Sequence, residues 1–204
     1  MTGVANAVAR LANAAVPTAN ASYGSGYRWL DWMNQQGQQQ NTWCGPATVS
    51  EMATTEANNG RLVGPVNQSD AAGTMATDLN GTSVPNEVAG INRYVAQPIV
   101  HRDYYSYIHN NEVNTFYSNL DYDLRNGWPI GGDGWEVPNG VHLVGHPRAF
   151  EIKHWFQIGG YQSYGSSTYY SDSATTMGWS GVQPFSWYNT SNLIYIFGGF
   201  GYAW

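Results

Sequence analysis

The 204-residue sequence has little charge, one lysine and one cysteine. Charged residues make up 11% of it, whereas about a quarter is usual in globular proteins. The formal net charge is −6 and no basic run is present, so we expect neither nucleic acid nor an anionic membrane surface as a partner. With Cys44 as the single cysteine, the chain can form no internal disulfide, and pairing says nothing about the redox compartment.

Long apolar runs are also missing. No window approaches the roughly 20 apolar residues that a membrane helix needs, so we expect no membrane span. The length and the 42% of hydrophobic residues favour one domain with a substantial core, and we expect it over residues 23–204, as a monomer. Residues 1–22, rich in Ala and Asn, are expected to be a leader-like or propeptide-like segment. Polar residues interrupt their apolar stretch, which argues against a signal peptide.

Tyr, Trp, Asn, Gln, Ser and Gly are abundant instead. Together with the shortage of lysine, this composition is typical of many secreted bacterial enzymes. We therefore expect a secreted bacterial protein.

The single cysteine lies where a helix is predicted to begin. Gly45 and Pro46 follow Cys44, and a proline in the first helical turn costs nothing because its missing N–H would have no partner there. Apolar residues then recur at roughly helical spacing until Asn59 and Gly60, a C-terminal stop signal. The thiol would lie at the positive end of the helix dipole, which favours the thiolate. The alternative interpretation is that a lone cysteine is a small buried hydrophobe.

A glutamine six positions before the cysteine offers a second polar group. The side-chain amide of Gln38 and the backbone N–H of Cys44 would donate two hydrogen bonds to an oxygen that becomes negative when a thiolate attacks a carbonyl. This pair predicts an oxyanion hole. The alternative is that the three consecutive glutamines at 38–40 form a polar loop.

A nucleophilic cysteine needs a base, and a histidine far downstream is the expected candidate. The sequence offers five: His101, His109, His142, His146 and His154. His154 opens a strand-like segment, residues 154–161, with a glycine-rich exit, and residues 168–172 read as a second strand that ends at Asp172. If the two strands pair antiparallel, His154 and Asp172 lie side by side, and the carboxylate can hold the imidazole tautomer.

These motifs resemble the papain-like cysteine peptidases of family thirty-nine, the group that includes the double-glycine bacteriocin-processing peptidases. The resemblance rests on Trp-Cys-Gly-Pro-Ala at 43–47 with the glutamine before it, on His-Trp-x-x-Ile-x-Gly-Tyr at 154–161 and on Tyr-x-Asp at 170–172. It spans about residues 27–197. Ser173 follows the aspartate where the family often has proline, and the Cys-Gly-Ser-Cys-Trp pattern of plant and lysosomal papains is missing, so their substrate preferences are not carried over.

The resemblance implies an α+β fold in which an N-terminal helical part packs on a C-terminal antiparallel sheet, with the nucleophile at a helix N-terminus. It also implies that Cys44 is the nucleophile, His154 the base, Asp172 the residue that orients the base and Gln38 the oxyanion donor. The implied activity is hydrolysis of a peptide or protein substrate through a thioester acyl-enzyme. The same residues would also serve a deamidase or a transferase.

A function of another class stays open. With nine Trp and fifteen Tyr, the weakly charged surface would also suit a non-catalytic module that binds peptides or carbohydrates. Retention of a complete Cys, His, Asp and Gln set argues for the enzyme.

Further segments complete the expected fold. We expect helices at about 83–98 and 111–126, strands near 99–101 and after 127, and a buried strand at 193–197. The glycine-rich segment 131–147 is predicted to be a loop, either in contact with substrate or packed by its own aromatic residues. No Cys, His and acid spacing points to a metal, so we expect neither metal nor cofactor.

Overall fold

The computed structural model describes residues 26–109 and 112–204, and the expected leader at 1–22 lies outside them. The strands are β1 (Arg28–Trp29), β2 (Tyr107–Ile108), β3 (Ile130–Glu136), β4 (Ile152–Gln162), β5 (Ser167–Ser171), β6 (Phe185–Asn189) and β7 (Gly201–Ala203). The α-helices are α2 (Cys44–Asn58), α3 (Gln68–Thr74), α4 (Val84–Ile91), α5 (Gln97–Val100), α6 (Val113–Arg125) and α7 (Thr190–Phe197). A π-helical stretch, Asn92–Ala96, joins α4 to α5, and two 3-10 turns lie at Ser163–Gly165 and Ser173–Thr176.

The strands form one antiparallel sheet in the order β2-β7-β3-β4-β5-β6, and the short β1 pairs with β4. Its central strand, β4, pairs with β3 from Ile152 to Ile158 and with β5 from Gln157 to Gln162. A register shift between Ile158 and Gly160 interrupts the second pairing. Bulges of this kind bend a strand and increase its twist.

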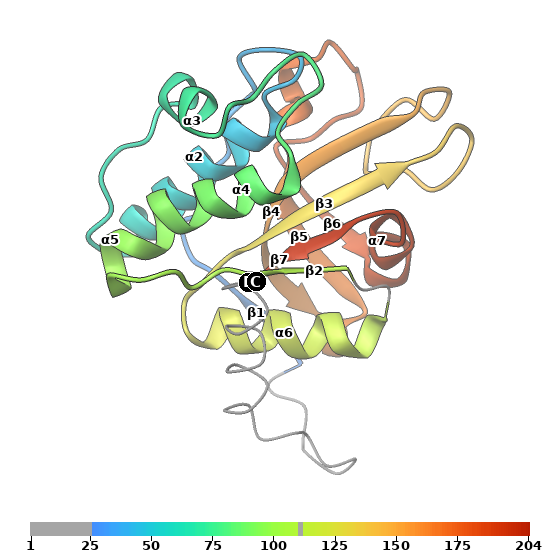
Figure 1. Ribbon diagram of the computed structural model, residues 1–204. Helices are drawn as coiled ribbons and strands as arrows, with labels where there is room; N and C mark the ends of the chain where they lie inside the picture. Colours follow the sequence, from blue (N-terminus) through green and yellow to red (C-terminus); the bar gives the residue numbers. More distant parts are fainter. Residues whose placement is uncertain (1–25, 110–111) are drawn as a thin grey trace.

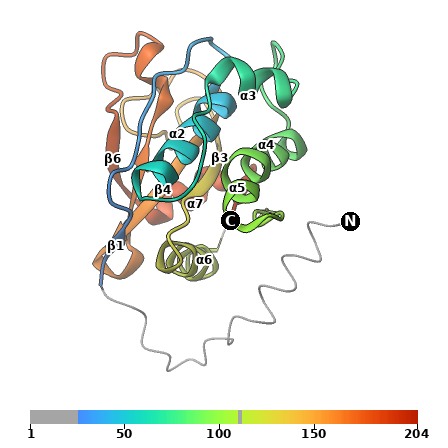
Figure 2. The same ribbon diagram turned by 90° about the vertical axis from the view of Figure 1, so that its left-hand side faces the viewer.

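Helices cover the sheet in two groups (Figure 1). Helices α2 to α5 lie together, and α6 lies apart from them, as the view turned by 90° also shows (Figure 2). Each group has its own buried cluster. One cluster joins α2 and α4 to the sheet through residues such as Met52 and Ile91, and the other joins α6 and α7 to it through residues such as Leu120 and Phe156. No helix within 26–109 or 112–204 has the length and apolarity to cross a membrane.

Several predicted elements are confirmed. Helix α2 begins at Cys44, and Asn59 and Gly60 end it, the latter with a φ of 82° that suits glycine. Helix α6 ends before Gly127, which has a φ of 76°. Strands β4 and β5 form at the expected places and pair antiparallel. The α+β class with a C-terminal antiparallel sheet is therefore confirmed.

The strand expected at 193–197 is wrong, because these residues belong to α7. The Asn189 side chain accepts a hydrogen bond from the Asn192 N–H over 3.0 Å and so caps the helix. Leu193 and Phe197 are buried, whereas Tyr195 is 63% exposed. Periodicity cannot distinguish a buried helix from a strand in so short an apolar run.

The strand expected near 99–101 is also wrong, since the helical path continues through Pro98 to Val100. Pro98 falls in the first turn of α5, where its missing N–H needs no partner. The π-helical stretch directly precedes this new start. The chain leaves the helix at His101, which has a left-handed φ of 54°.

The loop expected from residue 131 begins six residues later, because 131–136 belong to β3. Glycine is required in this strand by close packing. A Cβ at Gly132 would lie 2.8 Å from the Phe156 ring and 3.0 Å from Ile158. A glycine within a strand often marks such a close approach.

Candidate active site

The candidate nucleophile occupies the first position of α2 and is partly exposed. The helix packs against β4, which carries His154. Most of its residues are buried, including the polar Thr48, Ser50 and Glu51. The helix is thereby held on all sides while its N-terminal end, with Cys44, borders solvent. First-turn N–H groups have no partner within a helix, so this end favours a negative charge.

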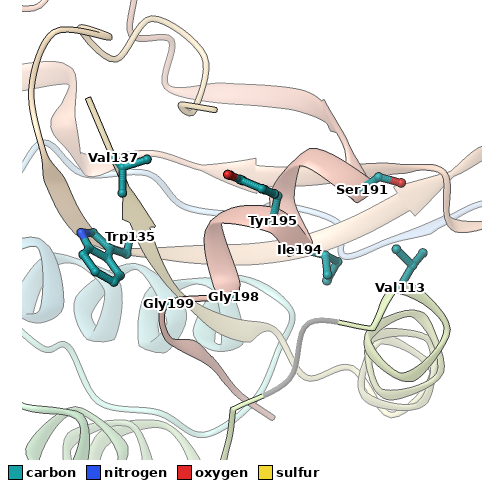
Figure 3. Close-up of a pocket in the computed structure, with 8 residues that line it drawn as sticks. All are labelled: Val113, Trp135, Val137, Ser191, Ile194, Tyr195, Gly198 and Gly199. Carbon is teal, nitrogen blue, oxygen red and sulfur yellow. The ribbon is translucent and has the colours of Figure 1, made fainter. Parts of the chain in front are cut away.

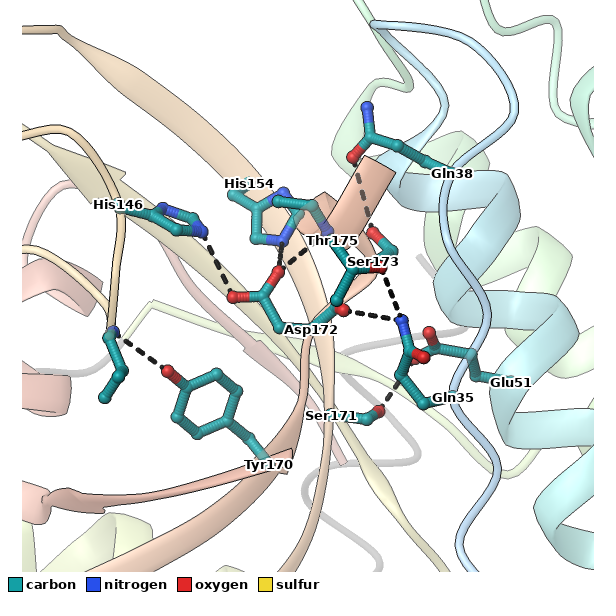
Figure 4. A network of polar contacts seen from close by, with 12 residues as sticks. Gln35, Gln38, Glu51, His146, His154, Tyr170, Ser171, Asp172, Ser173 and Thr175 are labelled. Atoms are coloured by element: carbon teal, nitrogen blue, oxygen red, sulfur yellow. Dashed lines mark hydrogen bonds and ion pairs between the residues drawn. The ribbon is translucent and has the colours of Figure 1, made fainter. Parts of the chain in front are cut away.

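His154 and Asp172 lie next to each other, as the strand pairing predicted. Nε2 of His154 lies 3.0 Å from Oδ1 of Asp172 (Figure 4). The same Oδ1 accepts a hydrogen bond from the Ala174 N–H over 2.9 Å, because Asp172 caps the 3-10 turn that follows β5. The position of the carboxylate thus follows from local backbone geometry at the end of β5.

The protonation of these groups follows from their contacts. Burial opposes the charged form of His154, but the charge and hydrogen bond of Asp172, followed by the hydrogen bond and charge of Cys44, raise the pKa of His154 well above its ordinary value of 6.5. Burial likewise opposes the carboxylate of Asp172, yet the charge of His154 and hydrogen bonds from His146 and His154 lower its pKa below 3.8. The arrangement favours an imidazolium between a carboxylate and the sulfur.

Gln38 is buried beside this group, and its side chain is fully bonded. Its Nε2 donates to the carbonyl oxygens of Gln40 and Asn41, each over 2.9 Å. Its Oε1 accepts from the Ser173 hydroxyl over 3.4 Å, and its backbone N–H donates to the Ser173 carbonyl over 2.8 Å. Both amide hydrogens therefore hold the loop that leads to Cys44. Donation to a substrate oxygen would replace one of these two bonds.

Sequence reasoning missed the role of His146 in the structure. Its Nδ1 lies 2.9 Å from Oε1 of Glu136, and its Nε2 lies 3.1 Å from Oδ2 of Asp172. Figure 4 shows His146 and His154 on the two oxygens of one carboxylate. The segment 131–147 had been expected to contact substrate or to pack on its own aromatic residues, and nothing in its spacing marks this residue.

A second missed residue, Glu87 of α4, lies behind the start of α2. Its Oε2 lies 2.2 Å from the point where a Cβ on Gly45 would stand. The carboxyl is fully buried, and neither of its oxygens has a hydrogen-bond partner in the described part of the chain. Burial, followed by the negative charges of Cys44 and Asp133, raises the pKa of Glu87 well above 4.5. A neutral carboxylic acid at this place leaves the helix N-terminus available to the sulfur.

A pocket of about 500 Å³ lies elsewhere, between the end of β3 and α7 (Figure 3). Trp135, Val137 and Tyr195 are among its lining residues, and none of the four candidate residues lines it. A groove of about 590 Å³ near β1 is lined by aromatic residues that include Trp29, Trp32 and Trp187. None of the four candidate residues lines this groove either.

One group of three side chains in the described residues has ligand atoms close enough for a metal ion. His146, His154 and Asp172 offer such atoms within 4.8 Å of one another. In the structure these atoms hydrogen-bond among themselves, His146 Nε2 and His154 Nε2 each to one carboxylate oxygen of Asp172. The direct contacts already satisfy the polar groups, so nothing here requires an ion.

Comparisons with known proteins bear on the fold and the family of this chain. The fold is similar to that of xylellain, a cysteine protease from Xylella fastidiosa, with a TM-score of 0.51, 10% sequence identity, and coverage of 88% of this chain and 83% of that chain. This likeness supports the papain-like form of the α+β fold. Among proteins with curated descriptions, none matches the sequence. The profile of the Peptidase_C39 like family matches residues 27–195, most of the chain. The chain therefore belongs to the Peptidase_C39 like family.

Proposed function

We propose that this chain is a cysteine peptidase in which Cys44, His154 and Asp172 act as nucleophile, base and orienting acid. The supporting observation is the position of His154, whose Nε2 faces Asp172 over 3.0 Å while its pKa responds to the Cys44 sulfur. Family membership supports the same class of reaction.

The proposed reaction has two steps. The Cys44 thiolate attacks the scissile carbonyl carbon, the C–N bond breaks, and the His154 imidazolium gives its proton to the leaving amine. Neutral His154 then takes a proton from water, whose oxygen attacks the thioester carbon; the C–S bond breaks, the acid is released, and the Cys44 thiolate and His154 imidazolium are restored. The Cys44 N–H and the Gln38 amide are the proposed donors to the oxyanion in both steps.

Two experiments test this proposal. Cleavage of a peptide library by the wild type should disappear in Cys44→Ser. Iodoacetamide labelling should be fast in the wild type at pH 6 and slow in His154→Ala, because an isolated thiol with a pKa of about 8.5 is almost wholly protonated at that pH. As Cys44 is the only cysteine, intact mass reports this site alone. Slow labelling that is indifferent to His154 would refute the proposal.

The reaction products distinguish a peptidase from a deamidase or a transferase. A deamidase or a transferase would form the same acyl-enzyme, and mass spectrometry of reacted peptides would show a loss of ammonia or a new amide instead of two fragments. Secretion, suggested by composition, belongs to the same proposal and is tested by fractionating the source cells.

A peptide- or carbohydrate-binding module is the second candidate. The aromatic groove near β1 favours it, because Trp29 is 48%, Trp32 76% and Trp187 39% exposed. Exposed indole rings suit stacking on sugars or peptide side chains. Binding of glycans or peptides by Cys44→Ser protein, abolished in Trp32→Ala, would support this function.

A further inference from the structure

His146 contacts acids through both of its ring nitrogens. Nδ1 lies 2.9 and 3.1 Å from the two carboxylate oxygens of Glu136, and Nε2 lies 3.1 Å from Oδ2 of Asp172. The ring is fully buried and packs edge-to-face against Trp179, with the centroids 5.0 Å apart. These contacts fix its position from three directions.

The contacts also favour the doubly protonated form of the His146 ring. A neutral imidazole has one N–H and one lone pair, and a lone pair would face a carboxylate oxygen at close range. The doubly protonated ring donates to both acids. Burial opposes this form, but the hydrogen bonds of Asp172 and Glu136 raise the pKa of His146 above 6.5.

The hydrogen bond between His146 and Asp172 completes the set of contacts around the Asp172 carboxylate. His154 and the Ala174 N–H occupy Oδ1, while His146 occupies Oδ2. A carboxylate held at both oxygens cannot turn about its terminal bond without breaking a hydrogen bond to a charged group, which is among the stronger kinds. The result is a buried row of alternating carboxyl and imidazole groups from Glu136 through His146 and Asp172 to His154.

We propose that His146 is a positioning residue for the reaction, which holds the Asp172 carboxylate so that Oδ1 meets His154. This proposal rests on the proposed peptidase function. Glu136 supports this role by binding Nδ1, the other ring nitrogen of His146. The ring nitrogens of His146 contact Glu136 and Asp172, so the proposed role is exerted through Asp172.

His146→Phe tests the proposal by releasing Oδ2. We expect iodoacetamide labelling of Cys44 at pH 6 to slow about tenfold and kcat for a cleaved library peptide to fall about 10 to 100-fold, by analogy with the loss caused by removing a residue that orients a metal-binding side chain. KM should stay within about twofold, because the residue acts on chemistry and not on uniform binding. Unchanged labelling and kcat in a folded variant would overturn the proposal.

Two variants act as controls. His101→Gln changes an exposed histidine at the end of α5, outside the loop that carries His146, and it should label like the wild type. Glu136→Gln can donate an amide hydrogen to Nδ1 of His146, so His146 still donates from Nε2 to Asp172. This conservative variant should keep most of the activity, and a loss as large as that of His146→Phe would contradict the proposed order of contacts.

A measurement on the wild type covers the case in which His146→Phe does not fold. Nitrogen-15 spectra of histidine-labelled protein should show a proton on Nε2 of His146 at pH 7. A His146 ring whose Nε2 carries no proton would overturn the proposal. If labelling depends on His146 and His154 but no peptide is cleaved, the positioning role stands and the peptidase function fails.

Discussion

The Ser171 hydroxyl donates a hydrogen bond to Oε2 of Glu51 over 2.8 Å and joins residues 120 positions apart. Oε1 of the same carboxyl accepts from the Gln36 N–H over 2.8 Å. Glu51 thus connects the helix that begins at Cys44 to the strand before Asp172 and to the loop before Gln38. Burial raises the pKa of Glu51 to about 8, although the Gln36 and Ser171 hydrogen bonds oppose this shift.

The raised pKa of Glu51 predicts a loss of stability with rising pH. Between pH 4.5 and about 8 the folded carboxyl keeps a proton that the unfolded chain has released. The free energy of unfolding should therefore fall as pH rises through this window, by about 1.4 kcal/mol per pH unit for this group. In Glu51→Gln this slope should be smaller, as urea unfolding at several pH values would show. The exposed Glu151→Gln is the control, and an equal slope in all three proteins would contradict the prediction.

Gly45→Ala should disturb the start of α2. The new Cβ would lie 2.2 Å from Glu87 Oε2 and 2.7 Å from Thr82 Oγ1. We expect a loss of about 1 to 3 kcal/mol of stability, the usual cost of overpacking, together with slower labelling of Cys44. Glu87→Ala in the same chain should recover part of the loss, which a double-mutant cycle by urea unfolding would measure.

A helical glycine with free space provides the comparison. A Cβ at Gly73 of α3 would meet nothing within 4 Å. Gly73→Ala should therefore stabilise the protein by about 0.5 to 1 kcal/mol. If Gly45→Ala behaved in the same way, the contact with Glu87 would not constrain this helix.

Gly145→Ala should disrupt the turn that positions His146. Gly145 has a φ of 80°, and a Cβ there would lie 1.9 Å from the backbone of Gly181. Gly178 also has a positive φ, of 75°, but a Cβ there meets nothing within 4 Å. Gly178→Ala should thus lower the free energy of unfolding by only about 1 to 2 kcal/mol, the cost of placing a Cβ on a left-handed backbone. Gly145→Ala should cost clearly more in thermal or urea unfolding and should slow Cys44 labelling, and equal losses would argue against the clash.

Gln38→Ala separates two roles of one side chain. If Gln38 donates to the oxyanion, its loss should lower kcat about 10² to 10³-fold. If Gln38 serves to hold the carbonyl groups of Gln40 and Asn41, its loss should mainly lower the melting temperature. We expect both effects, with the exposed Gln39→Ala as control. A lower melting temperature with unchanged kcat would remove Gln38 from the proposed oxyanion hole.

Two of the wrong predictions have identifiable physical causes. The apolar run at 193–197 is buried in a way that suits either a strand or a helix, and the cap at Asn189 together with the end of β6 makes it α7. Glycines 131, 132 and 134 suggested a loop, whereas close packing against residues such as Phe156 places them in a strand. At the glycines, packing against a distant strand outweighed local preference, whereas at α7 a local cap outside the apolar run decided the helix.

The sequence by itself determined the elements that local signals specify. A proline after Cys44 and an Asn-Gly stop define α2, and β-prone runs that end in turn residues define β4 and β5 and so bring His154 to Asp172. Only the tertiary structure decided what surrounds them. Glu136, His146 and Glu87 come from β3, a loop and α4, and no spacing along the chain encodes their approach, because buried ionisable groups acquire their partners from packing between elements.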